Sequence, residues 1–94
     1  MSAAAEADRQ IDNERVIVTR WTLPPGATTG PHRHEYDYVV VPVTDGTLVL
    51  TDPEGAVMTA ELASGRSYTR NAGVEHDVAN GGEEQVVFVE IELR

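Results

Sequence analysis

The sequence predicts an all-β domain, either a sandwich or a barrel, and three observations support this. Short segments rich in β-branched and other apolar residues recur along the chain, and clusters of Gly, Pro, Asn and Asp separate them about every 8–12 residues. No segment shows the apolar period of about 3.6 residues that a long amphipathic helix requires. The 94 residues are 40% hydrophobic, which suffices for one core, whereas a second core would need a longer chain.

We expect a flexible arm over residues 1–10 and a single β-domain over residues 11–94. The arm is small and charged, and it has no apolar face to bury. From Arg15 the sequence becomes rich in β-branched residues, which favours a strand that ends before Pro24-Pro25-Gly26. The rest of the chain shows no internal repeat and no linker, so one domain is expected.

The second predicted strand covers residues 36–43 and is nearly all apolar, as expected where both faces are covered. Pro42 within it indicates a sheet edge or a bulge, because proline has no N–H to donate to a ladder. Thr44-Asp45-Gly46 forms a turn, and we expect residues 47–51 to return as the hairpin partner of residues 36–43. The remaining extended segments are residues 56–62, 66–69, 75–79 and 85–93.

The charge balance of the chain excludes several classes of function. Sixteen acidic residues against seven arginines give a net charge of −9 at pH 7, which disfavours binding to nucleic acid. The chain has no lysine for a Schiff base, and no cysteine for a disulfide or a thiolate ligand. No apolar run approaches the roughly 20 residues that cross a bilayer. We therefore expect a cytoplasmic protein with neither a membrane nor a nucleic-acid partner.

The three histidines of the chain lie in two short extended segments. His32 and His34 are two residues apart, and side chains at that spacing share one face of a strand. His76 lies in another extended segment, where a ligand from a facing strand would be. Three neutral imidazoles suit one divalent ion of Fe, Mn, Ni, Cu or Zn and leave positions open for water or substrate. Spacing alone leaves two interpretations open, a metal site or incidental surface histidines.

The residues around His32 form a longer pattern. Gly26 precedes His32 by five intervening residues, a single residue separates His32 from His34, and Gly46 ends the turn further on. A second pattern begins at Gly65 and continues, again after five residues, with Asn71-Ala72-Gly73.

Two residues then separate this second group from His76, and three more separate His76 from Asn80. In these intervals and in their order, the two patterns resemble the two sequence motifs of the cupin family. The single departure in the second motif is Asn71, where the family usually has proline. The resemblance extends over about residues 15–93.

The resemblance implies two antiparallel sheets closed into a jelly-roll barrel, with a metal ion inside held by His32, His34 and His76. The acidic ligand of the first motif does not carry over, since its place falls at Tyr38 or at the next residue. Tyr38 has the parity of the histidines and should face inward, where packing or hydrogen bonding is the expected role and tyrosinate ligation the alternative. Asp37 has the opposite parity and remains an outside candidate for the fourth ligand.

A cupin site with three histidines and no acid resembles the iron centre of thiol dioxygenases and β-diketone-cleaving dioxygenases. The resemblance therefore implies an oxygenase, isomerase or lyase that acts on a small oxygenated organic compound. Tyr36 and Tyr38 share the parity of the histidines and are candidate catalytic residues, with core packing as the alternative role of Tyr36. The alternatives are a module that binds or senses a small ligand and a protein in which the metal only braces the barrel. Cupins commonly pair through sheet edges, so we expect a homodimer.

The last predicted strand places four side chains on one face. Val86 and Phe88 are expected to line either the barrel interior or a dimer interface. Glu90 and Glu92 follow on the same face, and we expect them to mark where that face reaches solvent.

Overall fold

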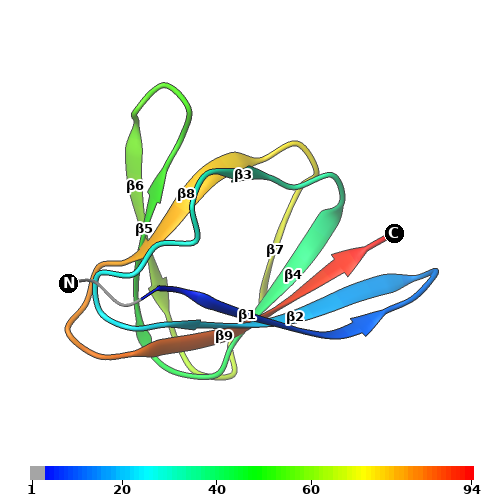
Figure 1. Cartoon of the computed structure of the whole chain (residues 1–94), viewed down its shortest axis with the longest axis horizontal. Coiled ribbons are helices and arrows are strands. Elements are labelled where there is room, and N and C mark those ends of the chain that lie inside the picture. Colours follow the sequence, from blue (N-terminus) through cyan, green and yellow to red (C-terminus); the bar gives the residue numbers. More distant parts are fainter. Residues whose placement is uncertain (1–3) are drawn as a thin grey trace.

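Nine antiparallel strands form two facing sheets in residues 4–94, the part of the chain that the computed structural model describes (Figure 1). The five-stranded sheet contains, in spatial order, β1 (Glu6–Asp12), β2 (Val16–Leu23), β9 (Val86–Leu93), β4 (Asp37–Pro42) and β7 (Tyr68–Arg70). The four-stranded sheet contains β3 (His32–Arg33), β8 (Glu75–Asn80), β5 (Gly46–Thr51) and β6 (Val57–Leu62). No helix capable of spanning a membrane occurs in the described residues. The predicted all-β, double-sheet jelly roll is thus confirmed.

The N-terminal segment differs from the expected flexible arm. Residues 6–10 belong to β1, which pairs with β2 in a register that joins Glu6 to Thr22 and Asp12 to Ile17. All seven residues of β1 are exposed, so backbone hydrogen bonds rather than side-chain burial hold the strand at the sheet edge. An apolar pattern could not reveal such a strand. Residues 1–3 of the expected arm lie outside the described residues.

The predicted hairpin between residues 36–43 and 47–51 is wrong, because β4 and β5 lie in different sheets. The backbone N–H groups of Val43 and Thr44 both donate to Val87 O on β9, which fixes the end of β4. Gly46 then packs so closely against Val86 that a Cβ at this position would lie 2.5 Å from Val86 Cγ2. The Thr44-Asp45-Gly46 turn is therefore an arch that carries the chain from one sheet to the other.

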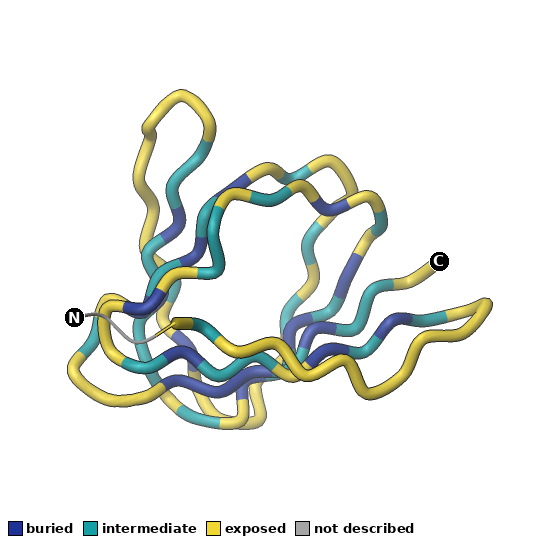
Figure 2. The backbone as a smooth tube through the Cα atoms, viewed as in Figure 1, coloured by how far each residue is buried: buried dark blue, intermediate teal, exposed yellow. Residues whose placement is uncertain are grey.

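Buried residues lie on strands of both sheets (Figure 2). The core between the sheets continues directly into a region of buried polar side chains. Along β9 the buried inward face contains Val86 and Phe88 and then Glu90. Along β8 the buried inward positions are Asn80, Val78 and His76. Val86 and Phe88 therefore line the barrel interior. Both strands change from apolar to ionisable side chains at the same end of the barrel, and this change positions the candidate site.

Candidate metal centre

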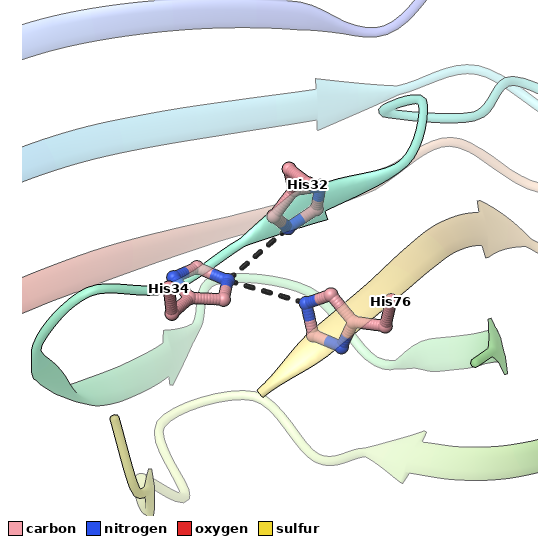
Figure 3. Close-up of side chains that lie close together, drawn as sticks. All are labelled: His32, His34 and His76. Carbon is pink, nitrogen blue, oxygen red and sulfur yellow. Dashed lines mark hydrogen bonds between the residues drawn. The ribbon is translucent and has the colours of Figure 1, made fainter. Parts of the chain in front are cut away.

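The three histidines converge on one point inside the barrel (Figure 3). His32 Nε2 lies 3.1 Å from His34 Nε2, and His34 Nε2 lies 3.2 Å from His76 Nε2. His34 and His76 are buried, with 5% and 9% of their surfaces exposed, whereas His32 is half-buried. Three nitrogen atoms that could bind a metal thus share one small space at the end of the core.

Strand pairing brings these side chains together. His32 on β3 lies directly opposite His76 on β8 in the antiparallel register. The ladder continues past β3, because His34 N donates to Val74 O at 2.9 Å and Gly73 N donates to His34 O at 2.8 Å. His34 therefore keeps the inward face that its two-residue spacing from His32 predicts.

The imidazole of His32 is oriented by its other ring nitrogen. His32 Nδ1 lies 2.9 Å from Gly30 O, a carbonyl oxygen that can only accept, so Nδ1 carries the proton. Nε2 of the neutral ring then offers a lone pair to the shared space. Thr29 Oγ1 supports the same segment, since it also donates to Gly30 O and accepts from Val78 N on β8.

Tyr38 supports His34 from within the core. The two rings stack with centroids 3.9 Å apart and an interplanar angle of 21°. Burial raises the pKa of the Tyr38 hydroxyl, so the side chain is a neutral phenol and not a tyrosinate. Asp37 is exposed, and its Oδ1 accepts a hydrogen bond from Ala72 N at 2.7 Å. Tyr38 thus packs against a histidine of the site, whereas the carboxylate of Asp37 binds the backbone of the segment before β8.

Burial also determines the charge of two of the histidines. Desolvation, followed by repulsion from neighbouring histidines, lowers the pKa of His34 from 6.5 to about 4. Desolvation and the nearby His32 lower the pKa of His76 to about 4 as well. Both imidazoles are therefore neutral at pH 7, which is the form that binds metal ions.

Glu90 on β9 brings a carboxylate to the same region, although we expected it to mark where this face of the strand reaches solvent. Only 7% of its surface is exposed, Trp21 Nε1 donates to its Oε1 at 2.9 Å, and its Oε2 lies 3.7 Å from His34 Nε2. Burial raises the pKa of Glu90 to about 7. The sequence does place Glu90 on the same face of the strand as Val86 and Phe88, and this alternation could have indicated that it is buried. The contact with Trp21 could not be predicted, because it depends on the pairing of β2 with β9.

The donor set fits a transition-metal ion. Two nitrogens that bind one ion at about 2.1 Å lie about 3.0 Å apart at a right angle and about 3.4 Å apart at the tetrahedral angle. The distances of 3.1 and 3.2 Å fall between these values. Hydrogen bonding is a poorer explanation, because His34 Nε2 approaches two other ring nitrogens and a neutral ring nitrogen makes one conventional hydrogen bond. A cation at this point satisfies all three lone pairs.

A cavity of about 550 Å³ leads from solvent to His32 and His34. Tyr36, the other candidate catalytic residue, lines it together with Glu90 and Glu92. Arg9 and Arg94 also line the cavity, and the Arg94 guanidinium lies 5.8 Å above the Tyr36 ring. The structure therefore brings Tyr36, His32 and His34 to one cavity, beside acidic and basic groups from the five-stranded sheet and the C-terminus.

Comparison with known proteins identifies the family of the chain. Residues 19–92 match the family described as the cupin domain. The chain is 58% identical over 85 residues to the beta-alanine degradation protein BauB of Pseudomonas aeruginosa. The alignment covers 90% of this chain and 88% of that protein.

Solved structures give the same result. A cupin domain from Bordetella pertussis is 54% identical, with a TM-score of 0.93 over 100% of this chain and 97% of that one. An RmlC-like cupin with a double-stranded β-helix fold from Methanocaldococcus jannaschii is 15% identical, with a TM-score of 0.79 over 95% and 79% of the two chains, and shares the fold alone. The chain belongs to the cupin family.

Proposed function

We propose that this chain is a metal-dependent enzyme whose three-histidine centre binds a small organic acid. The observation that carries the proposal is that His34 Nε2 lies 3.1 Å from His32 Nε2 and 3.2 Å from His76 Nε2 inside the barrel. The divalent ion that these residues would hold supplies a Lewis acid for an oxygen atom of the substrate. Histidine ligands are neutral and therefore leave the centre with a net positive charge, which favours an anionic substrate.

Two observations support the proposed substrate class. The related BauB protein is named for β-alanine degradation, and β-alanine is a three-carbon carboxylic acid with an amino group on its third carbon. The cavity is large enough for such a compound, and Arg9 and Arg94 at its wall carry charges opposite to a carboxylate. We propose three-carbon acids with an amino, hydroxyl or oxo group on the third carbon as substrates.

Other side chains of the cavity orient the substrate and control protons. Glu90 Oε2, 3.7 Å from His34 Nε2, adjoins the place where an oxygen atom of the substrate would meet the metal centre. The Tyr36 hydroxyl can donate a hydrogen bond to the substrate from the cavity wall. Arg94 is held by Asp12 through a 3.2 Å ion pair, which fixes its position near Tyr36.

Binding of the acids to the cobalt-loaded protein tests the proposal. Co²⁺ suits imidazole ligands and has visible absorption bands that respond to each change of ligand. β-Alanine and its 3-hydroxy and 3-oxo analogues should shift these bands, whereas the corresponding amides, which lack the carboxylate charge, should not. The variant Arg94→Gln should need about ten times more acid to produce the same shift of the cobalt bands. Arg66→Gln is the matched control, because Arg66 lies outside the cavity lining.

Turnover separates the enzyme from the binding module. The iron-, manganese- and zinc-loaded proteins should convert at least one of the acids that shift the cobalt spectrum. Spectral shifts without conversion by any of these forms would support a binding or sensing module. Absence of any shift would refute small acids as the substrate class.

A further inference from the structure

Glu90 directs one carboxylate oxygen toward His34, the histidine that lies next to both of the others. Its Oε1 accepts from Trp21 Nε1 at 2.9 Å, whereas the nearest charged-group contact of Oε2 is His34 Nε2 at 3.7 Å. The Glu90 side chain is nine-tenths buried. Ligand atoms from His34, Glu90 and Glu92 lie within 4.8 Å of one another, and this group shares His34 with the group of three histidines.

A carboxyl group that stays ionised in this buried position needs a positive charge nearby. An isolated ionised carboxylate is costly to bury unless it is paired or coordinates a metal. Among residues 4–94, no Arg side chain lies within ion-pair distance of Glu90. His34 does not supply the charge either when it binds a metal, because its Nε2 then offers a lone pair rather than a proton.

The other acidic or phenolic candidates for a fourth ligand point elsewhere or are unsuitable. Asp37 is exposed and accepts from Ala72 N. Tyr38 packs face to face on the His34 ring as a neutral phenol. Glu92 is only half-buried and is one inward position further from the core than Glu90.

We propose that Glu90 is the fourth protein ligand of the metal, through Oε2. The inference rests on the metal centre of the proposed function and assigns its acidic ligand to the last strand, β9, instead of the segment after His34. The Trp21 N–H holds the other carboxylate oxygen, which fixes the orientation of the ligand. The carboxylate reduces the net charge of the centre from +2 to +1 and occupies one of the positions that three histidines leave open.

The cobalt-loaded protein tests this ligand directly. In its crystal structure Glu90 Oε2 should lie about 2.0–2.2 Å from the ion, together with the three Nε2 atoms. The variant Glu90→Gln should weaken Co²⁺ binding at least tenfold in competition with a chelator and change the visible bands. Glu75→Gln is the matched control, because it removes the same charge from an exposed position next to His76 and should leave the affinity within twofold.

A shortened side chain separates ligation from simple charge attraction. Glu90→Asp keeps the charge but withdraws the carboxylate by one methylene, so it should also weaken binding about tenfold. Full affinity in Glu90→Asp, or a Glu90 Oε2 more than 3 Å from an ion held by three histidines, would overturn the inference and leave the three-histidine centre intact. Failure of the wild-type protein to bind Co²⁺ would overturn the metal centre and Glu90 with it.

Discussion

The metal-free protein should lose stability as the pH falls from about 6.5 to about 4.5. In the folded protein the pKa of His34 and that of His76 are each lowered to about 4, whereas an unfolded chain titrates near 6.5. Between these values the unfolded chain binds protons that the folded protein does not, so the free energy of unfolding falls with pH. This contribution is fully present above pH 6.5 and is lost as the pH falls towards 4.

Glu90 acts in the opposite direction. Its folded pKa is raised from 4.5 to about 7, so the folded protein binds one proton that the unfolded chain releases between these values. This contribution favours the folded state at low pH and is lost as the pH rises through 7. Two histidine protons minus one glutamate proton leave a net difference of one between pH 4.5 and 6.5. At about 1.4 kcal/mol per proton and pH unit, the free energy of unfolding should drop by about 3 kcal/mol over this range.

Urea unfolding at a series of pH values, with a chelator present, measures how the free energy of unfolding changes with pH. The fluorescence of the single tryptophan, Trp21, is the probe. Glu90→Gln removes the opposing proton, so the slope should double to about 2.7 kcal/mol per pH unit. Glu75→Gln, exposed on β8, is the control and should follow the wild type. A free energy of unfolding that stays constant or rises as the pH falls through this range would refute the reasoning that burial keeps these histidines neutral.

Two further predictions concern the barrel itself. Asn80 is 3% exposed; its side chain donates to Leu23 O and Glu84 O and accepts from Gly82 N. Asn80→Ala should lower the free energy of unfolding by about 2–4 kcal/mol, because these buried backbone groups lose their partners. A loss below about 0.5 kcal/mol in urea unfolding would contradict this prediction. The protein should sediment as a homodimer, at twice the 10.2 kDa mass of one chain, because β1 leaves an exposed sheet edge available for pairing; a single 10.2 kDa species at micromolar concentration would remove this expectation.

Periodicity and motif spacing predicted the features that depend on local sequence. The His32–His34 pair shares a face because side chains alternate along an extended chain, and the same alternation places Val86 and Phe88 on one face of β9. Asn80 in the second motif also has a local reason, since its side chain satisfies the backbone at the end of β8.

Features that depend on the partner of a strand could not be predicted in this way. The Thr44-Asp45-Gly46 turn has the composition of a hairpin, but its hydrogen bonds to Val87 make it an arch between sheets. β1 lacks any buried face, so only its ladder with β2 identifies it. Glu90 resembles a residue at the solvent boundary until the β2–β9 pairing brings Trp21 next to it.

Metal content of the purified protein beside His76→Ala tests the central claim most directly. After expression without added metal, the wild type should contain about one equivalent of a transition metal per chain, and the variant should contain less than a tenth of that while its far-ultraviolet spectrum still shows a β-sheet protein. Metal retained in His76→Ala, or no metal in either folded protein even after incubation with Fe²⁺, Mn²⁺, Co²⁺ or Zn²⁺, would contradict the three-histidine centre.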